Sequence, residues 1–181
     1  MIVKETNLKG SFIIEPEIFD DKRGVFFESF NKKKFEKKTK IKINFVQDNQ
    51  SKSQKGVLRG LHFQKPPYAQ AKLVRVVQGS VLDVAVDLRK NSKTYGQYDS
   101  VVISAENKKS FFIPEGFAHG FLTLEDNTIF SYKCGNVYDA ESEDALLWND
   151  EHLKINWGIE NPILSSKDSV AKQFNEFITP F

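Results

Sequence analysis

Short runs in which apolar and polar residues alternate, separated by turns rich in glycine, asparagine and lysine, fill residues 43–134. A repeat of two residues is the pattern of a strand that buries one face, whereas a helix buries every third or fourth residue. The strand-like runs do not alternate with helical ones, as they would in a parallel α/β sheet. The pattern therefore predicts an antiparallel β sandwich or barrel.

Two neighbouring runs, 72–78 and 81–88, flank Gly79 and Ser80, and this spacing predicts a hairpin with a glycine-containing turn. Further strands are expected over residues 98–104, 110–113, 117–124 and 128–134. An amphipathic helix is predicted over 31–38, and helical turns packed outside the sheet are predicted over 164–177.

A chain of 181 residues is long enough to bury one substantial core. No internal repeat or low-complexity linker divides it, so we expect a single domain spanning residues 1–181. Within it we expect an N-terminal arm over 1–42 with a hairpin at 11–30, a β core over 43–160 and a helical tail over 161–181.

Composition excludes several classes of protein. A single cysteine, Cys134, rules out a disulfide framework and favours a reducing compartment, so we expect a cytoplasmic protein. A net charge of +2 argues against a nucleic-acid binder, and the lysine-rich run at 32–42 is more typical of a solvated helix or turn. No apolar run approaches the length of a signal segment or membrane span, so no membrane partner is expected.

The run 58–64 places Arg59 and His62, one of only three histidines, in a strand-like stretch. An imidazole near a guanidinium suggests acid–base chemistry on an anion, although a core histidine and a surface arginine would give the same pattern. In a regular strand these two side chains face opposite sides. Gly60 stands between them and could hold a bulge. If both residues act on one ligand, a bulge or twist near Gly60 is required.

Four other polar residues stand where a sheet core does not need them. Lys72 lies on an apolar strand face, so it requires a partner or a ligand unless it protects an edge strand. His119 lies between glycines at a strand start and Tyr132 lies among apolar neighbours, but a turn residue and a core tyrosine explain them equally well. Asp168 could be either a functional group or a helix N-cap.

Metal-binding β barrels often carry a His-x-His pair followed by a carboxylate and a third histidine. That pair is missing here, because Gln64 occupies the second position after His62. The three histidines, His62, His119 and His152, have no short ligand spacing. The sequence therefore predicts no metal site.

Taken together, nine ordered segments resemble the motifs of the nucleotide-sugar epimerases typified by dTDP-4-dehydrorhamnose 3,5-epimerase, which are non-metal members of the cupin jelly rolls. The segments are 21–28, 45–49, 57–64, 69–75, 83–87, 104–107, 113–120, 147–150 and 166–168. The resemblance covers residues from about Phe19 to Asp168. It implies an all-β, cupin-type jelly-roll barrel or sandwich with an N-terminal strand arm and short C-terminal helices.

The same resemblance implies the roles of individual residues. His62 would be the general base, oriented by Asp168, Tyr132 the acid on the other side of the sugar, and Lys72 the group that steadies the enolate oxygen. The positions implied to bind substrate are Arg23, Glu28, Gln47, Asp48, Asn49, Arg59, His119, Glu143 and Lys167, with Tyr138 stacking on the base. In the family the arm reaches a neighbouring subunit, which implies a homodimer.

The implied activity is that of an isomerase that inverts C3 and C5 of dTDP-4-dehydro-6-deoxy-D-glucose, without a cofactor, to give dTDP-4-dehydro-L-rhamnose for dTDP-L-rhamnose biosynthesis. Hydrogens beside a 4-keto group become acidic only if the enolate is stabilised, and inversion needs a base and an acid on opposite faces of the ring. Inversion at one carbon, or of a related nucleotide sugar, would use the same residues. Two alternative hypotheses are a sugar-binding jelly roll without catalysis and a metal-dependent cupin enzyme.

Overall fold

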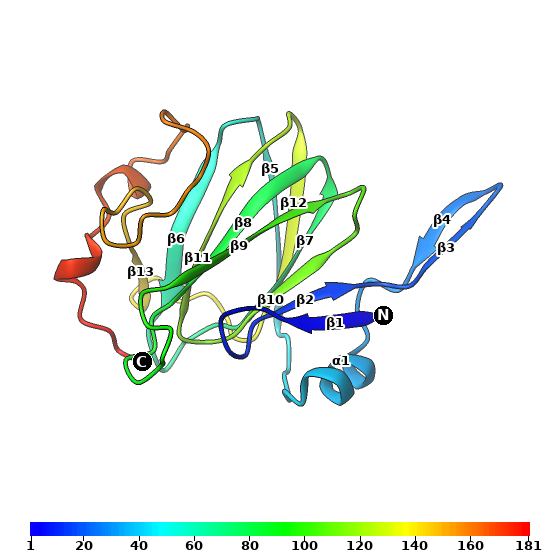
Figure 1. Cartoon of the computed structure of the whole chain (residues 1–181), viewed down its shortest axis with the longest axis horizontal. Coiled ribbons are helices and arrows are strands. Elements are labelled where there is room, and N and C mark those ends of the chain that lie inside the picture. Colours follow the sequence, from blue (N-terminus) through cyan, green and yellow to red (C-terminus); the bar gives the residue numbers. More distant parts are fainter.

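Two antiparallel sheets packed face to face form the body of the computed structural model, which covers residues 1–181 (Figure 1). The six-stranded sheet has the order β1-β2-β10-β7-β12-β5, and the five-stranded sheet has the order β13-β6-β11-β8-β9. A separate two-stranded ribbon pairs β3 with β4. The predicted all-β sandwich with short C-terminal helical turns is confirmed.

The elements follow one another along the chain with short connections. The strands are β1 Ile2–Glu5, β2 Phe12–Glu15, β3 Ile18–Asp21, β4 Gly24–Phe27, β5 Gln47–Ser53, β6 Leu58–Gln64, β7 Lys72–Gln78, β8 Ser80–Asp87, β9 Tyr98–Ser104, β10 Ser110–Ile113, β11 Phe117–Thr123, β12 Thr128–Cys134 and β13 Glu143–Ala145. The helices are α1 Lys32–Thr39 and two single 3-10 turns, η1 Asp168–Val170 and η2 Phe174–Glu176. No helix has the length and apolar character needed to cross a membrane.

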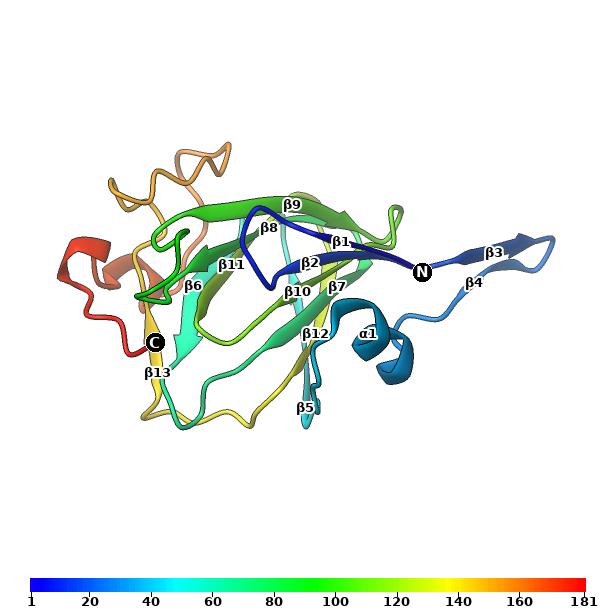
Figure 2. The same ribbon diagram turned by 60° about the horizontal axis from the view of Figure 1, so that its bottom comes forward.

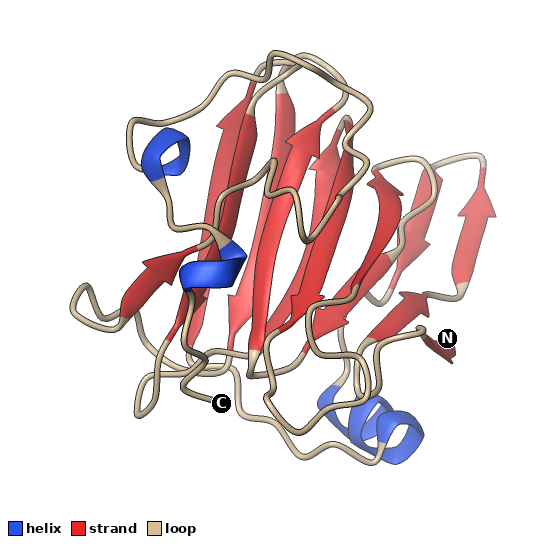
Figure 3. Cartoon of the chain, turned by 60° about the vertical axis from the view of Figure 1, so that its left-hand side comes forward, coloured by secondary structure: helices blue, strands red, loops and turns tan.

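Three apolar clusters hold these layers together. The cluster between the sheets includes Val74, Phe121 and Phe130. The outer face of the five-stranded sheet is covered by the C-terminal segment, whose 3-10 turns lie against it (Figure 3), and the outer face of the six-stranded sheet is covered by α1 through Phe35. The central strands are therefore covered on both faces, whereas the edge strands β5 and β9 expose outward residues.

The predicted helix at 31–38 is confirmed to within one residue at each end. The side chain of Asn31 caps α1 by accepting a hydrogen bond from the backbone N–H of Lys34 at 3.1 Å. Lys40 ends the helix in the left-handed conformation, with φ of 64°.

The predicted hairpin across Gly79 is wrong. β7 pairs with β10 and β12, whereas β8 pairs with β9 and β11, so the chain passes from one sheet to the other at Gly79. Gly79 has φ of +78°, and a Cβ built there would come within 2.2 Å of Thr128 Oγ1. Glycine is thus required by a close crossing between the sheets rather than by a hairpin turn.

The predicted N-terminal arm is mostly part of the body. β1 and β2 extend the six-stranded sheet because Phe12 and Ile14 are buried in its outer core. Only the β3–β4 ribbon projects beyond the sandwich, as Figures 1 and 2 both show. The hairpin expected at 11–30 is therefore shorter than the sequence suggested.

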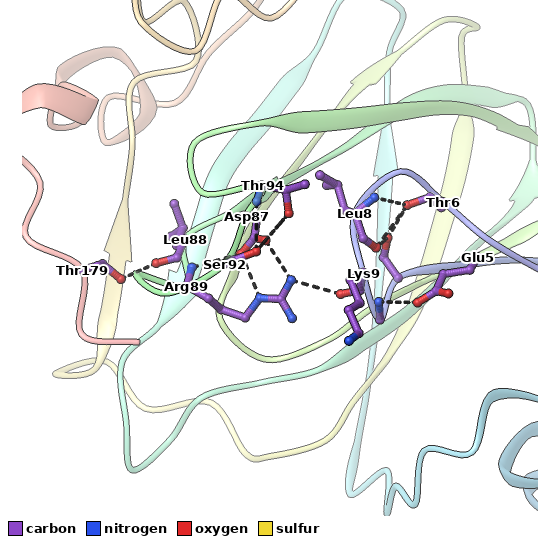
Figure 4. Close-up of polar contacts among 12 residues, drawn as sticks. Glu5, Thr6, Leu8, Lys9, Asp87, Leu88, Arg89, Ser92, Thr94 and Thr179 are labelled. Atoms are coloured by element: carbon purple, nitrogen blue, oxygen red, sulfur yellow. Dashed lines mark hydrogen bonds and ion pairs between the residues drawn. The ribbon is translucent and has the colours of Figure 1, made fainter.

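A buried polar cluster fastens the loop after β8 to the loop between β1 and β2 (Figure 4). The fully buried carboxylate of Asp87 accepts hydrogen bonds from Arg89 Nε at 2.8 Å, Arg89 Nη2 at 2.7 Å, Ser92 Oγ at 2.5 Å and Thr94 Oγ1 at 2.6 Å. Arg89 also donates to the backbone carbonyl of Lys9 at 3.0 Å. These donors hold the pKa of Asp87 at about 2 although burial opposes ionisation.

Candidate active site

A cavity of about 120 Å³ opens between the two sheets, where β5, β7 and β12 of one sheet face β6 and β13 of the other. Polar side chains dominate its lining, which consists of Gln47, Asn49, His62, Phe63, Gln64, Gln70, Lys72, Tyr132, Tyr138 and Glu143. A neighbouring cavity of about 360 Å³ shares His62 and Glu143 with it and adds Lys167. Seven of the side chains implied by the resemblance thus line one cavity, and an eighth lines the next.

The bulge predicted near Gly60 is confirmed. Along the pairing of β6 with β11, His62 lies opposite His119 and Arg59 lies opposite Phe121, so one extra residue of β6 fits between these pairs. Gly60 has φ of +129°, and a Cβ built on it would lie 2.5 Å from Gly120 Cα. Only glycine allows this backbone conformation and this close approach.

The bulge turns Arg59 to the same interior side as His62. The guanidinium of Arg59 reaches across to β5, where Nη2 and Nε lie 3.3 and 3.4 Å from Ser53 Oγ. Burial raises the pKa of the Tyr132 phenol, and the positive charge of Arg59 partly opposes that rise. Arg59 is therefore placed beside the cavity, as a ligand for an anionic group would have to be.

His62 is held by an acidic residue from the C-terminal segment. Its Nε2 lies 2.5 Å from Asp168 Oδ1, and the Asp168 side chain is 3% exposed. Burial opposes ionisation of Asp168, but its hydrogen bonds with His62, Ser165 and the backbone of Gly60 outweigh burial and lower its pKa. An ionised carboxylate only accepts hydrogen bonds, so Nε2 carries the hydrogen and Nδ1 is left free to take a proton.

Tyr132 faces the cavity from the opposite sheet. Burial is the main reason why the pKa of its hydroxyl is raised, although Asn49 and Arg59 oppose the shift. The hydroxyl therefore stays protonated at neutral pH and can donate a proton. His62 and Tyr132 line the same cavity from β6 and β12, which belong to different sheets.

Lys72 brings a cation into the same cavity. It lies on β7, which is flanked by β10 and β12, so the alternative that it protects an edge strand is wrong. Its Nζ lies 5.9 Å from the centroid of the Tyr132 ring. Burial lowers the pKa of Lys72, while Cys134, Asp83 and Glu143 oppose that change.

The rim of the site is polar and open. Glu143 Oε2 accepts hydrogen bonds from the Tyr138 hydroxyl at 3.1 Å and from Lys167 Nζ at 3.0 Å. Burial opposes ionisation of Glu143, but these two bonds prevail and lower its pKa. Tyr138 is 54% exposed, so its aromatic ring is accessible for stacking.

Besides Arg59, Asp168 and Lys167, four residues expected at the site lie outside this cavity. Asp48 points away from it, because Gln47 and Asn49 occupy the inward positions of β5, and it binds Lys133 Nζ at 3.0 Å on the outer face. Arg23 lies in the turn of the β3–β4 ribbon and Glu28 directly follows it. The ribbon projects away from β6, the strand that carries His62 (Figure 1). His119 lies next to His62 but is only 6% exposed.

Sequence reasoning did not assign Gln64, Gln70, Asp83 or Cys134 to this part of the molecule. Gln64 Nε2 donates to the carbonyls of Tyr68 and Val137 at 2.7 and 3.1 Å and so holds the loops that border the cavity. An aspartate at an inward position of an otherwise apolar strand is a visible signal, and Asp83 carries it. Gln64 and Gln70 carry no such signal, since glutamines near strand ends are ordinary.

An imidazole held by a carboxylate, a protonated phenol across from it and a cation beside both are the groups that an acid–base isomerase requires, and here they lie in a cupin-type β sandwich. The sequence profile of the dTDP-4-dehydrorhamnose 3,5-epimerase family matches residues 5–176. The chain therefore belongs to this family, as its motifs predicted, and is an epimerase.

Individual relatives agree with that assignment. The dTDP-4-dehydrorhamnose 3,5-epimerase of Shigella flexneri is 53% identical over 174 residues, which is 96% of each chain. The crystal structure of the enzyme of the same name from Elizabethkingia anophelis superposes with a TM-score of 0.94 at 52% identity, over 97% of both chains. The dTDP-6-deoxy-D-glucose-3,5-epimerase of Legionella pneumophila, solved in complex with dTDP-4-keto-L-rhamnose, has a TM-score of 0.92 at 48% identity and covers 96% of this chain and 93% of that one.

Proposed function

We propose that this epimerase inverts C3 and C5 of dTDP-4-dehydro-6-deoxy-D-glucose to give dTDP-4-dehydro-L-rhamnose, with His62 as the base and Tyr132 as the acid. One observation carries the proposal: these two side chains line a single cavity from opposite sheets, and Lys72 lines it with them. A group that removes a proton from one face of a ring and a group that returns a proton to the other face are the minimum that inversion requires.

In each inversion Nδ1 of His62 takes the hydrogen from the carbon next to the ketone, and the electron pair moves onto the carbonyl oxygen. The Lys72 ammonium stabilises the resulting enolate oxyanion. When the enolate collapses, the same carbon takes the phenolic proton of Tyr132 on the opposite face. The imidazolium, stabilised by Asp168, then loses its proton and the tyrosinate regains one by exchange with solvent, so the enzyme returns to its starting state.

The nucleotide would lie along the rim. Tyr138 offers an exposed aromatic face for the base, and the Arg59 guanidinium offers planar donors for the diphosphate. Gln47 and Asn49 supply amide groups inside the cavity, and Glu143 and Lys167 supply a carboxylate and an ammonium at its mouth. This arrangement supports a dTDP-linked substrate and includes no protein-bound cofactor in any step.

The β3–β4 ribbon supports a homodimer in which each chain completes the site of the other. Four large apolar side chains of the ribbon are exposed, with Phe19 at 56% and Phe26 at 70%. A two-stranded ribbon that exposes such residues is not stable alone, so a second copy is the natural cover. Arg23 and Glu28 would then reach the partner's substrate.

Two variants test the roles of the base and the acid. In deuterated water, His62→Asn should lose both deuterium incorporation and inversion, and Tyr132→Phe should retain incorporation but lose inversion, because the base still acts. Each should lower kcat by roughly 10²- to 10⁴-fold, with dTDP binding measured by calorimetry unchanged. If neither variant changed the rate, the assignment would be wrong.

Mass spectrometry of the wild-type product distinguishes the two related reactions. Two exchanged carbon positions support inversion at C3 and C5, and one position supports a single-site epimerase. Absence of any exchange would contradict both.

A further inference from the structure

Asp83 is a buried acidic residue that the mechanism above does not use. It lies on β8 with none of its surface exposed, between Phe121 of β11 and Val101 of β9. His119 Nε2 lies 3.0 Å from each of its carboxylate oxygens. A carboxylate in such a place is strongly unfavourable unless donors and cations surround it. The position therefore needs an explanation other than packing.

Lys72 is the second charged group in this part of the interior. It enters from β7 in the opposite sheet and lines the cavity together with His62, which lies opposite His119, the partner of Asp83. The titratable groups that face its ammonium are the Tyr132 hydroxyl and Cys134 thiol from β12, Asp83 from β8, His119 from β11 and Glu143 from β13.

The two carboxylates that face Lys72 differ in their other partners. Glu143 is already bound to Lys167 Nζ at 3.0 Å and to the Tyr138 hydroxyl at 3.1 Å, and it lies at the rim. Asp83 has only the imidazole of His119 as a hydrogen-bond partner. Asp83 is consequently the carboxylate whose charge is available to balance the buried ammonium.

Burial shifts the pKa values of both groups toward their neutral forms, and the attraction between the two groups opposes each shift. Burial lowers the pKa of Lys72, and Asp83 is among the groups that oppose the loss of its charge. Burial raises the pKa of Asp83, and His119 and Lys72 oppose that change in turn. Each group thus favours the charged form of the other. Stabilisation of an enolate requires the ammonium and not the neutral amine.

We propose that Asp83 is a positioning residue for the epimerase reaction: fixed by His119, its buried carboxylate keeps Lys72 protonated in the cavity where the enolate oxygen forms. The inference rests on the role proposed above for Lys72. Because both oxygens of Asp83 lie at 3.0 Å from one imidazole nitrogen, the carboxylate is held in a single orientation between β8 and β11.

The direct test is the titration of Lys72 itself, which a purely structural role for Asp83 would not change. The carbon-13 shift of Lys72 Cε, assigned by comparison with Lys72→Met, is followed with pH in lysine-labelled wild type and in Asp83→Asn. The midpoint should fall by about one pH unit or more in Asp83→Asn. The matched control is Asp87→Asn, a second fully buried inward aspartate of β8 whose partners are Arg89, Ser92 and Thr94.

Kinetics gives an independent reading. Above the new midpoint, Asp83→Asn should lower kcat by about tenfold or more with KM within about twofold, and the basic limb of its pH profile should move in the same direction as the Lys72 midpoint. Asp87→Asn should leave both the midpoint and kcat as in the wild type. An unchanged Lys72 midpoint in folded Asp83→Asn would overturn the inference.

Failure of this inference and failure of the proposed function give different results. If Lys72→Met loses epimerisation while Asp83→Asn leaves the Lys72 midpoint and kcat unchanged, only the role of Asp83 is wrong. If Lys72→Met epimerises normally, the role of Lys72 is wrong.

A third variant covers the case in which Asp83→Asn does not fold. Combining it with Lys72→Met removes both buried charges, and the pair should then recover stability relative to Asp83→Asn. A double variant as unstable as the single one would show that the two charges do not face each other.

Discussion

Replacing Asp87 by asparagine should lower the free energy of unfolding in a pH-dependent way. The carboxylate is fully buried, and hydrogen bonds from Arg89, Ser92 and Thr94 hold its pKa at about 2 against an ordinary value of 3.8. A difference of about 1.8 pH units corresponds to about 2.4 kcal/mol at neutral pH, since one unit is worth about 1.4 kcal/mol. That is a large part of the stability of an ordinary domain.

The sign follows from the lowered pKa. The folded state binds this proton less readily than the unfolded state, so the contribution is fully present above the unfolded value and is lost as pH falls toward about 2. The same two pKa values give about 1.3 kcal/mol at pH 3 and about 0.4 kcal/mol at pH 2. The contribution therefore shrinks between about pH 5 and pH 2.

Urea unfolding of wild type and Asp87→Asn at several pH values measures the difference directly, because the other carboxylates titrate in both proteins. Asp20→Asn, which removes an exposed aspartate of the β3–β4 ribbon, controls for the loss of one negative charge. A stability difference between wild type and Asp87→Asn that stayed the same at pH 7 and pH 3 would refute the reasoning, since the ionised carboxylate would then not be its source.

Two further substitutions test the partner of His62 and the bulge in β6. Asp168→Asn should lower kcat by about 10²- to 10⁴-fold with little change in KM, because the carboxylate that orients His62 and stabilises its protonated form is lost, and steady-state kinetics would expose an error if kcat were retained. Gly60→Ala should destabilise the fold by about 3 kcal/mol or more in thermal unfolding, because the new Cβ would lie 2.5 Å from Gly120 Cα. The control is Gly24→Ala, which has a similar φ and no atom within 4 Å of the new Cβ, and it should cost only about 1 kcal/mol. Equal losses of stability in the two variants would contradict the argument.

The sequence predicted strands at 72–78, 98–104, 110–113 and 128–134, which are the bounds of β7, β9, β10 and β12. Short runs rich in apolar residues between turn residues were sufficient for these strands. The assignment of strands to sheets could not be predicted, because Gly79 permits both a hairpin turn and a crossing, and only the contact of its backbone with Thr128 decides between them. No local sequence pattern predicts that contact.

The site likewise includes features that the sequence predicts and features that it does not. His62 and Asp168 lie 106 residues apart, so their contact was implied by a family resemblance and by no local spacing. Asp48 shows the opposite case, because three consecutive residues of a regular strand cannot all face one cavity. Because Gln47 and Asn49 line the cavity, Asp48 must face away from it. The alternation of side chains along β5 was sufficient to predict this.

Two aspartates on one strand show how the surroundings, rather than the residue type, determine a role. Asp83 and Asp87 both point inward from β8, and both are fully buried. Asp87 accepts bonds from three side chains at the strand end, so its pKa falls to about 2 and its charge stabilises the fold. Burial raises the pKa of Asp83, because its one imidazole partner and the Lys72 ammonium oppose burial without outweighing it. Asp87→Asn should therefore change stability and spare the rate of epimerisation, whereas Asp83→Asn should change the rate through Lys72.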